Sequence, residues 1–205
     1  MKFEKIIKQF FAIVIIGIIG YITYIATKPV IPVLIQAGHE GRLSGNTGAE
    51  NGLDREVEWN IIVADEIYRV LKTWGIESKR IPADTNFENA EIAVAIHFDS
   101  AKNICHSGAS IGYPNKDSID FANRWRELYS QYFPFGWHDD NFTNNLKYYY
   151  AYHWIRSKKF LVLELGELTC QEQLKWLKPR LKQIAHLIAY AIAKELGHDV
   201  QKPNL

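Results

Sequence analysis

Short apolar segments recur along the chain, and such segments are typical of strands buried in a sheet. The strongest two read EIAVAIH at 91–97 and FLVLEL at 160–165, where aliphatic side chains run almost without interruption. The segment PVLIQA ends at Gly38, which favours a turn at that point. The pattern predicts five strands, at residues 32–37, 76–81, 91–97, 109–113 and 160–165.

Longer segments between these strands repeat apolar residues every three or four positions, which is the period of a helix with one buried face. The first of them includes Val63 and Ile67 and is followed by Gly75, a residue that commonly ends helices. The pattern predicts helices at residues 56–74, 118–132 and 171–196, with Pro179 as a point where the last can break. Strands alternating with helices indicate an α/β domain with a mostly parallel central sheet flanked by helices on both sides.

The beginning of the chain differs from the rest, because residues 9–26 (QFFAIVIIGIIGYITYIA) contain no charged side chain. A helix of this length rises about 27 Å, close to the ~30 Å hydrocarbon core of a bilayer. A buried helix of a soluble domain is an alternative, but a small domain has no interior that surrounds an apolar helix on all sides. We therefore expect one N-terminal transmembrane helix ahead of the domain.

A cleaved signal peptide is a second interpretation of this segment. Its cleavage site needs small residues at the last and third-last positions. An end at Ala26 places the bulky Tyr24 third from last, which favours an uncleaved anchor.

Lysines on the two sides of the span predict its orientation. Three precede it and only Lys28 follows closely, so the N-terminus is expected in the cytoplasm. We therefore expect a membrane anchor at residues 1–28 and a folded domain at 29–205 on the periplasmic or extracellular side.

The charges of the 205-residue chain nearly cancel, with 24 Lys and Arg against 23 Asp and Glu and a net charge of +1. A nucleic-acid-binding protein usually carries a basic face, so no nucleic-acid partner is expected. Two cysteines, Cys105 and Cys170, are too few for a disulfide scaffold and lack the close spacing of a zinc ribbon. They could pair in an oxidising compartment, but the sequence does not give their distance.

Polar residues collect where three of the predicted strands end, and open α/β sheets form their sites at such strand ends. His39 follows the first strand, His97 closes the third, and Glu164 lies inside the last. Glu56 begins the first long helix. Two imidazoles and one carboxylate are a standard ligand set of catalytic zinc, and a further carboxylate can move the proton of the attacking water. The spacings between these residues match no local metal motif. On the residues alone, the alternative to a metal site is that each histidine is an ordinary loop or core residue.

The segments around these four residues resemble the zinc-dependent N-acetylmuramoyl-L-alanine amidases of bacterial cell walls, the amidase_3 family. The family's Asp-Ala-Gly-His-Gly-Gly is similar to residues 36–41 (QAGHEG), and its Glu with Asn four residues later is similar to 56–60 (EVEWN). Its Ser-Ile-His-Ala-Asn is similar to 95–100 (AIHFDS), and its final Glu-containing motif to 163–169 (LELGELT). The resemblance extends over about residues 32–197.

The resemblance implies zinc as the cofactor, with His39, Glu56 and His97 as metal ligands and Glu164 as the catalytic carboxylate. A neighbouring glutamate is the alternative ligand, but Glu56 fits the spacing to the Asn four residues later. The implied activity is hydrolysis of the amide between N-acetylmuramic acid and L-alanine. Peptidoglycan and, through the N-terminal helix, the membrane are then the expected partners.

The chain departs from the family pattern at a few positions near these motifs. Gln36 replaces an Asp, Glu40 replaces a glycine, and Glu167 stands where an apolar residue is usual. Lys158 and Lys159 occupy the place of a proline before the last strand. All four metal and catalytic positions are kept, so the departures are expected to affect the substrate more than the zinc chemistry.

Other functions stay open on the same fold. The chain could be a non-catalytic or partner-activated membrane-tethered cell-wall-binding module, or a zinc hydrolase of another amide or peptide. The aromatic-rich residues 132–154 are expected to serve mainly as packing, with sugar or peptide binding as the alternative. Residues 138–140 (HDD) are expected to form a solvated loop rather than a second metal site.

Overall fold

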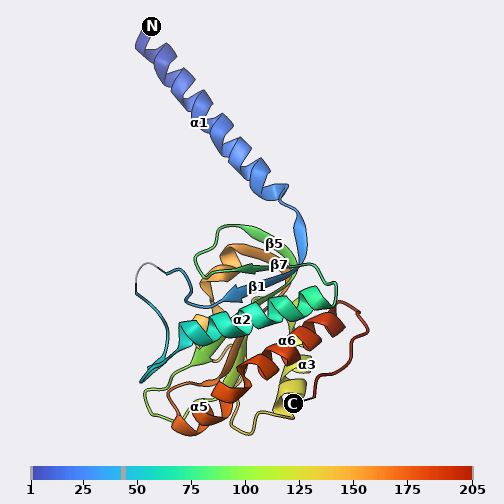
Figure 1. The fold of residues 1–205 in the computed structure, drawn as a ribbon. Helices are drawn as coiled ribbons and strands as arrows, with labels where there is room; N and C mark the ends of the chain where they lie inside the picture. The colour runs from blue at the N-terminus through green and yellow to red at the C-terminus, as the bar shows by residue number, and fades with distance from the viewer. Residues whose placement is uncertain (1, 43–44, 205) are drawn as a thin grey trace.

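Five strands form one sheet in the order β4-β1-β5-β7-β6 in the computed structural model, which describes residues 2–42 and 45–204 (Figure 1). Neighbouring strands pair in parallel except at the β7–β6 edge, which is antiparallel. The predicted, mostly parallel sheet is thereby confirmed. The strands are β1 (Val30–Ala37), β4 (Ser78–Ile81), β5 (Glu88–Asp99), β6 (Ala109–Gly112) and β7 (Ile155–Glu167), with a separate antiparallel pair β2 (Glu50–Asn51) and β3 (Asp54–Arg55).

Three long helices cover one face of the sheet, and their apolar stripes pack with alternate side chains of β1, β5 and β7 in the larger core. These helices are α2 (Glu56–Thr73), α3 (Ile119–Ser130) and α6 (Leu181–Glu195). A short helix, α5 (Gln171–Leu177), precedes α6 and is separated from it by a 3-10 turn at Lys178–Arg180. The turn contains Pro179, which has no N–H to continue the α-helix, so the predicted break occurs there.

The opposite face carries only short helical turns, α4 (Asn144–Lys147) and η2 (Tyr150–His153). Their aromatic and aliphatic side chains form a second, smaller core with Leu34, Ala93 and Val162 of the sheet. Because successive residues of a strand point to opposite faces, residues two or four positions further along these strands point to this same face. They are Gln36, His97 and Glu164, so strand alternation alone places three polar side chains together.

The N-terminal helix α1 (Lys2–Ala26) projects away from the sheet (Figure 1). Its segment Ile6–Ile25 is long and apolar enough to cross a membrane, and apart from Ile25 at its end it is not buried against the domain. Lys28 follows the helix and donates to the Glu88 carboxylate at 2.7 Å, at the start of β5. The helix is thus a candidate membrane span, and the division into an anchor and a catalytic domain stays a prediction.

A disulfide joins Cys105 to Cys170, which settles the pairing that the sequence left open. Cys105 lies in the loop after β5, and Cys170 precedes α5 just after β7. The bond therefore ties together two loops that leave the sheet at the same end.

Candidate metal centre

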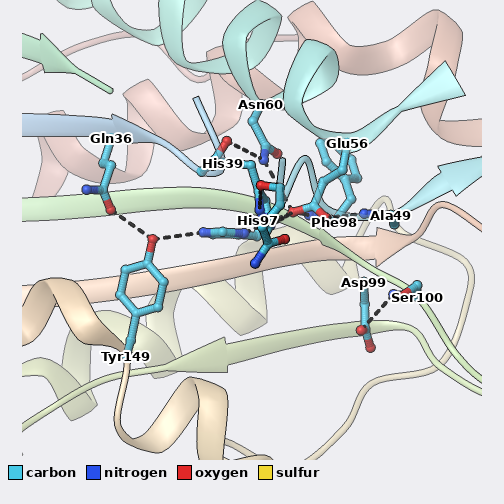
Figure 2. A network of polar contacts seen from close by, with 12 residues as sticks. Gln36, His39, Ala49, Glu56, Asn60, His97, Phe98, Asp99, Ser100 and Tyr149 are labelled. Atoms are coloured by element: carbon cyan, nitrogen blue, oxygen red, sulfur yellow. Dashed lines mark hydrogen bonds and ion pairs between the residues drawn. The ribbon is translucent and has the colours of Figure 1, made fainter. Parts of the chain in front are cut away.

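His39, Glu56 and His97 come together at the carboxyl ends of β1 and β5, although they belong to three different elements (Figure 2). Glu56 Oε1 lies 3.2 Å from His39 Nε2 and 2.9 Å from His97 Nδ1. Ligands of a tetrahedral zinc ion lie roughly 3.3 Å from one another, given metal–ligand distances near 2.1 Å. These three side chains therefore have the spacing of a metal ligand set.

Two glycines make room for this cluster. A Cβ on Gly38 would lie 2.3 Å from His97 Cε1, so a larger residue would displace the ring. Gly48 has a φ of +81°, and a Cβ there would lie 2.1 Å from Glu56 Oε2. His39 itself adopts a φ of 63°, a left-handed conformation that costs a non-glycine residue about 1–2 kcal/mol. The loop between β1 and α2 is thus shaped around the side chains of His39 and Glu56.

The tautomer of His39 is fixed by a hydrogen bond of its Nδ1, the ring nitrogen that points away from Glu56. Its Nδ1 lies 3.0 Å from the backbone oxygen of Asn46. A carbonyl oxygen can only accept, so Nδ1 carries the proton. The lone pair of Nε2 is then directed at Glu56, which is the arrangement of a metal-binding histidine.

A chain of hydrogen bonds fixes the tautomer of His97 in the same way. The Gln36 amide nitrogen donates to the Ala83 carbonyl at 3.3 Å, so its Oε1 faces Tyr149 and accepts from the hydroxyl at 2.9 Å. The hydroxyl has a single hydrogen, so it must accept the one from His97 Nε2, also at 2.9 Å. His97 Nδ1 is therefore unprotonated, and its lone pair faces Glu56 Oε1 (Figure 2).

In these tautomers three acceptor atoms face one another in a buried place, where a metal ion or a proton shared with Glu56 stabilises them. Burial raises the pKa of Glu56, but the hydrogen bonds and charge of His39 and His97, when their facing nitrogens carry a proton, outweigh it and hold the pKa below its usual range. Burial lowers the pKa of His97, which keeps the ring neutral. The Ala49 N–H donates to Glu56 Oε2 at 2.8 Å and Asn60 to Oε1 at 3.3 Å, which orient the carboxylate. An ionised carboxylate with two neutral imidazoles is the donor set that zinc prefers.

Glu164 faces the same place from β7, where it is the register partner of His97. Both side chains line a cavity of about 310 Å³. Its Oε2 is buried and has no hydrogen-bond partner among the described residues. Burial raises the pKa of Glu164 well above its usual value, and the nearby Glu56 and Asp99 carboxylates raise it further. A carboxyl of this kind can bind and release a proton inside the cavity.

The structure thus brings His39, His97 and Glu164 to one cavity, and Glu56 lies against the two histidines beside it. The HDD loop at 138–140 lies elsewhere, where Asp140 pairs with Arg126 and His138 bonds Ser107. Sequence reasoning gave no role to Tyr149, and the density of aromatic residues at 132–154 was the only signal for it.

The fold and the cluster define an α/β domain with a candidate metal centre at the carboxyl ends of its strands. The family model described as N-acetylmuramoyl-L-alanine amidase matches residues 33–194. The chain therefore belongs to the N-acetylmuramoyl-L-alanine amidase family, and it is an enzyme of this amidase class. A search of curated proteins finds no match.

Several solved amidase structures share the fold. AmiC2 of Nostoc punctiforme superposes with a TM-score of 0.62 at 20% identity, covering 83% of this chain and 99% of that one. The catalytic domain of CwlV from Bacillus (Paenibacillus) polymyxa var. colistinus gives 0.61 at 19%, covering 83% and 100%. CwlD of Clostridioides difficile, in complex with the GerS lipoprotein, gives 0.60 at 19%, covering 82% and 100%. At these identities the likeness concerns the fold.

Proposed function

We propose that the protein is a zinc-dependent amidase that hydrolyses the bond between N-acetylmuramic acid and L-alanine in peptidoglycan. One observation carries the proposal: His39 Nε2, His97 Nδ1 and Glu56 Oε1 face one another as acceptors in a buried place. Zinc held by these atoms would supply a Lewis acid that polarises the amide carbonyl and acidifies water.

Glu164 is assigned the proton transfers of the reaction. Its carboxylate takes a proton from the attacking water, and the resulting carboxyl then gives that proton to the departing amine of L-alanine. The side chain suits both steps because it lines the cavity and Oε2 has no other partner among the described residues. Asn60 supports the centre by donating to the Gly38 carbonyl at 3.0 Å and to Glu56, which holds the loop and the helix together.

We further propose that residues 1–28 anchor the enzyme in a membrane and that residues 29–205 act on the periplasmic or extracellular side. The lysines before the apolar helix support this orientation. The Cys105–Cys170 disulfide supports it independently, because such bonds persist in oxidising compartments and are rare in the cytosol.

A partner-activated or non-catalytic form of the same fold is the alternative. CwlD is described in complex with a lipoprotein. Of the two alternatives, activation by a partner is therefore the one to test. In this chain α3, the long helix between His97 and Glu164 in the sequence, packs against α6 and the core and does not line the cavity. A site that α3 does not cover favours an enzyme that is active without a partner.

The test uses the full-length chain, purified in detergent and freed of metal by a chelator. The protein is incubated with peptidoglycan with and without added zinc, and released fragments are identified by mass spectrometry. We expect zinc-dependent release of stem peptides with a free L-alanine amine, and none from Glu164→Gln. Zinc binding without release would favour the partner-activated alternative, and neither binding nor release would overturn the proposal.

A further inference from the structure

Arg42 is a cation of the metal-centre cavity to which the proposed chemistry gives no role. It lies three residues after His39, and its side chain lines the same 310 Å³ cavity as His39, His97 and Glu164. Its guanidinium carbon lies 4.8 Å from the centroid of the Tyr150 ring. Cation–π stacking therefore holds the half-buried side chain against the cavity wall.

The guanidinium has no acidic partner within residues 2–42 and 45–204. Acids of the neighbouring segments are engaged elsewhere: Glu40 pairs with Arg80, and Glu50 accepts from the Thr47 hydroxyl at 3.1 Å. No described acceptor bonds the side chain of Arg42 either, so its five N–H donors are available to a ligand.

Apart from Glu164 and the two metal-centre histidines, the described wall of the cavity is neutral, so Arg42 is its one permanent cation. Asn46, Asn145 and the tyrosines at 148–150 contribute neutral amide, hydroxyl and aromatic groups. An arginine presents a planar fork that matches a carboxylate with two parallel hydrogen bonds. The cavity therefore offers a carboxylate site next to the metal centre.

Peptidoglycan carries few anions close to the bond that the proposed function cleaves. The lactyl carboxyl of N-acetylmuramic acid is consumed in the amide, and the sugar bears only hydroxyl and acetamido groups. The first free carboxylate belongs to the residue after L-alanine, which is a D-isoglutamate when ionised and a D-isoglutamine when amidated. One residue spans about 3.3–3.6 Å, so this group lies within a single residue's reach of the cleaved amide.

We propose that Arg42 binds the α-carboxylate of the second stem-peptide residue and thereby selects stems in which this carboxylate is free. The inference rests on the proposed function, because it needs the scissile amide to lie at the metal centre. A carboxamide offers one acceptor and turns an NH₂ group toward the guanidinium, so it loses the bidentate pair. Loss of one charged hydrogen bond of this kind corresponds to about 10- to 100-fold in affinity.

The test compares two synthetic substrates that differ only in this group, N-acetylmuramoyl-L-alanyl-D-isoglutamate and N-acetylmuramoyl-L-alanyl-D-isoglutamine. Their kcat/KM values are measured with the zinc-loaded full-length enzyme by chromatography of the released dipeptide. We expect the wild type to prefer the acid by about 10- to 100-fold. In Arg42→Gln the preference should fall to near 1, mainly through KM, and Arg42→Lys should keep part of it.

Arg180→Gln is the matched control. Arg180 also stacks on an aromatic ring, with its guanidinium carbon 4.9 Å from the Trp176 centroid, but it does not line the cavity. This variant should keep the wild-type preference.

The outcomes separate the two proposals. Equal hydrolysis of acid and amide by the wild type would overturn the role of Arg42 while leaving the amidase function in place. A parallel loss on both substrates in Arg42→Gln, with the preference kept, would also overturn it, because Arg42 would then shape the loop. Failure of the wild type on both substrates and on peptidoglycan would remove the proposed function and this inference together.

Discussion

Two glutamates of β7, three residues apart, each have a buried carboxylate oxygen but occupy opposite kinds of surroundings. Glu164 lines the cavity and its Oε2 has no described hydrogen-bond partner. Glu167 is fully buried, yet it accepts the N–H groups of Cys105 and Ser107 at 2.8 and 2.7 Å and the Thr169 hydroxyl at 2.8 Å. Burial of a carboxylate oxygen therefore does not by itself distinguish a catalytic carboxylate from a structural one.

The hydrogen-bonding partners make the distinction. A carboxylate that accepts several N–H and O–H bonds is stabilised as an anion and serves to hold those groups in place. A buried carboxyl without partners is costly, and such a group is retained where chemistry needs it. On this reasoning Glu164 contributes to activity and Glu167 to stability, and substitutions can separate the two roles.

The largest effect is expected from Glu164→Gln. Loss of the proton-transfer group should lower kcat by about 10²- to 10⁴-fold. Zinc content and melting temperature should change little, because the amide has nearly the same volume and removes no described bond of Oε2. Steady-state kinetics, metal analysis and thermal unfolding check the three quantities. Wild-type kcat in this variant would refute the assignment of Glu164.

The next largest effect is expected on stability, from removal of the disulfide. This bond holds the same loop at Cys105 that Glu167 holds through its hydrogen bonds. Cys105 and Cys170 are separated by 65 residues. For a loop of that length, the chain-entropy model assigns a disulfide about 4 kcal/mol. The Cys105→Ser, Cys170→Ser double variant should therefore melt roughly 10 °C lower, measured by thermal unfolding. An unchanged melting temperature would show that other contacts fix this loop.

Glu167→Gln should invert the result for Glu164→Gln. The amide keeps one acceptor oxygen and turns an NH₂ group toward an N–H donor, so the unfolding free energy should fall by about 1.5–3 kcal/mol. The kcat should stay within a few-fold of wild type, because Glu167 does not line the cavity. Urea denaturation and steady-state kinetics measure both. A large loss of kcat with full stability would erase the contrast between the two glutamates.

Tyr149→Phe tests whether the hydrogen-bond partner of the metal ligand His97 affects zinc binding, just as the hydrogen-bond partners of the two glutamates determine their roles. The variant removes the acceptor of His97 Nε2–H, so the ring loses the bond that fixes its tautomer. Zinc affinity should fall about 10- to 100-fold, measured by competition with a chromophoric chelator. Tyr152→Phe is the control, because its hydroxyl donates to the Leu146 carbonyl at 3.0 Å, outside this chain of hydrogen bonds. Equal affinities in the two variants would contradict the role of Tyr149.

The smallest effect is expected at a third glutamate, Glu66, which is held by cations. The bonds from Arg69, with a smaller contribution from His186, lower its pKa to about 2 despite partial burial. A carboxylate with a lowered pKa stabilises the fold above its usual value of 4.5 and loses that contribution as the pH falls toward 2. Glu66→Gln should thus melt about 2–4 °C lower at pH 7. Melting curves across pH 2–7 should show this difference shrinking below pH 4.5.

Much of the fold follows from local pattern. The apolar run EIAVAIH predicts the strand that carries His97, and Pro179 marks the break before α6. The antiparallel direction of β6 did not follow, because a strand of four residues carries no signal of its direction.

The candidate site likewise has one part that the local sequence predicts and one part that it does not. Its four main residues stand at strand and helix ends, where residue type and position suffice to single them out. The support of His97 depends on Tyr149, which reaches Gln36 across 113 residues from a segment without regular periodicity. Contacts of that kind are set by how the chain folds back on the sheet, as is the approach of Cys105 to Cys170.

The direction of β5 has a mechanical consequence for an anchored enzyme. The strand begins at Glu88, which is bonded to Lys28 below the apolar helix, and reaches His97 near its other end. The intervening rise is about 30 Å. In a chain held in a bilayer by α1, the sheet would keep the metal centre no more than roughly that distance from the end of the anchor, whatever the tilt of the domain. Such an enzyme would reach only peptidoglycan that lies close to the membrane that holds it.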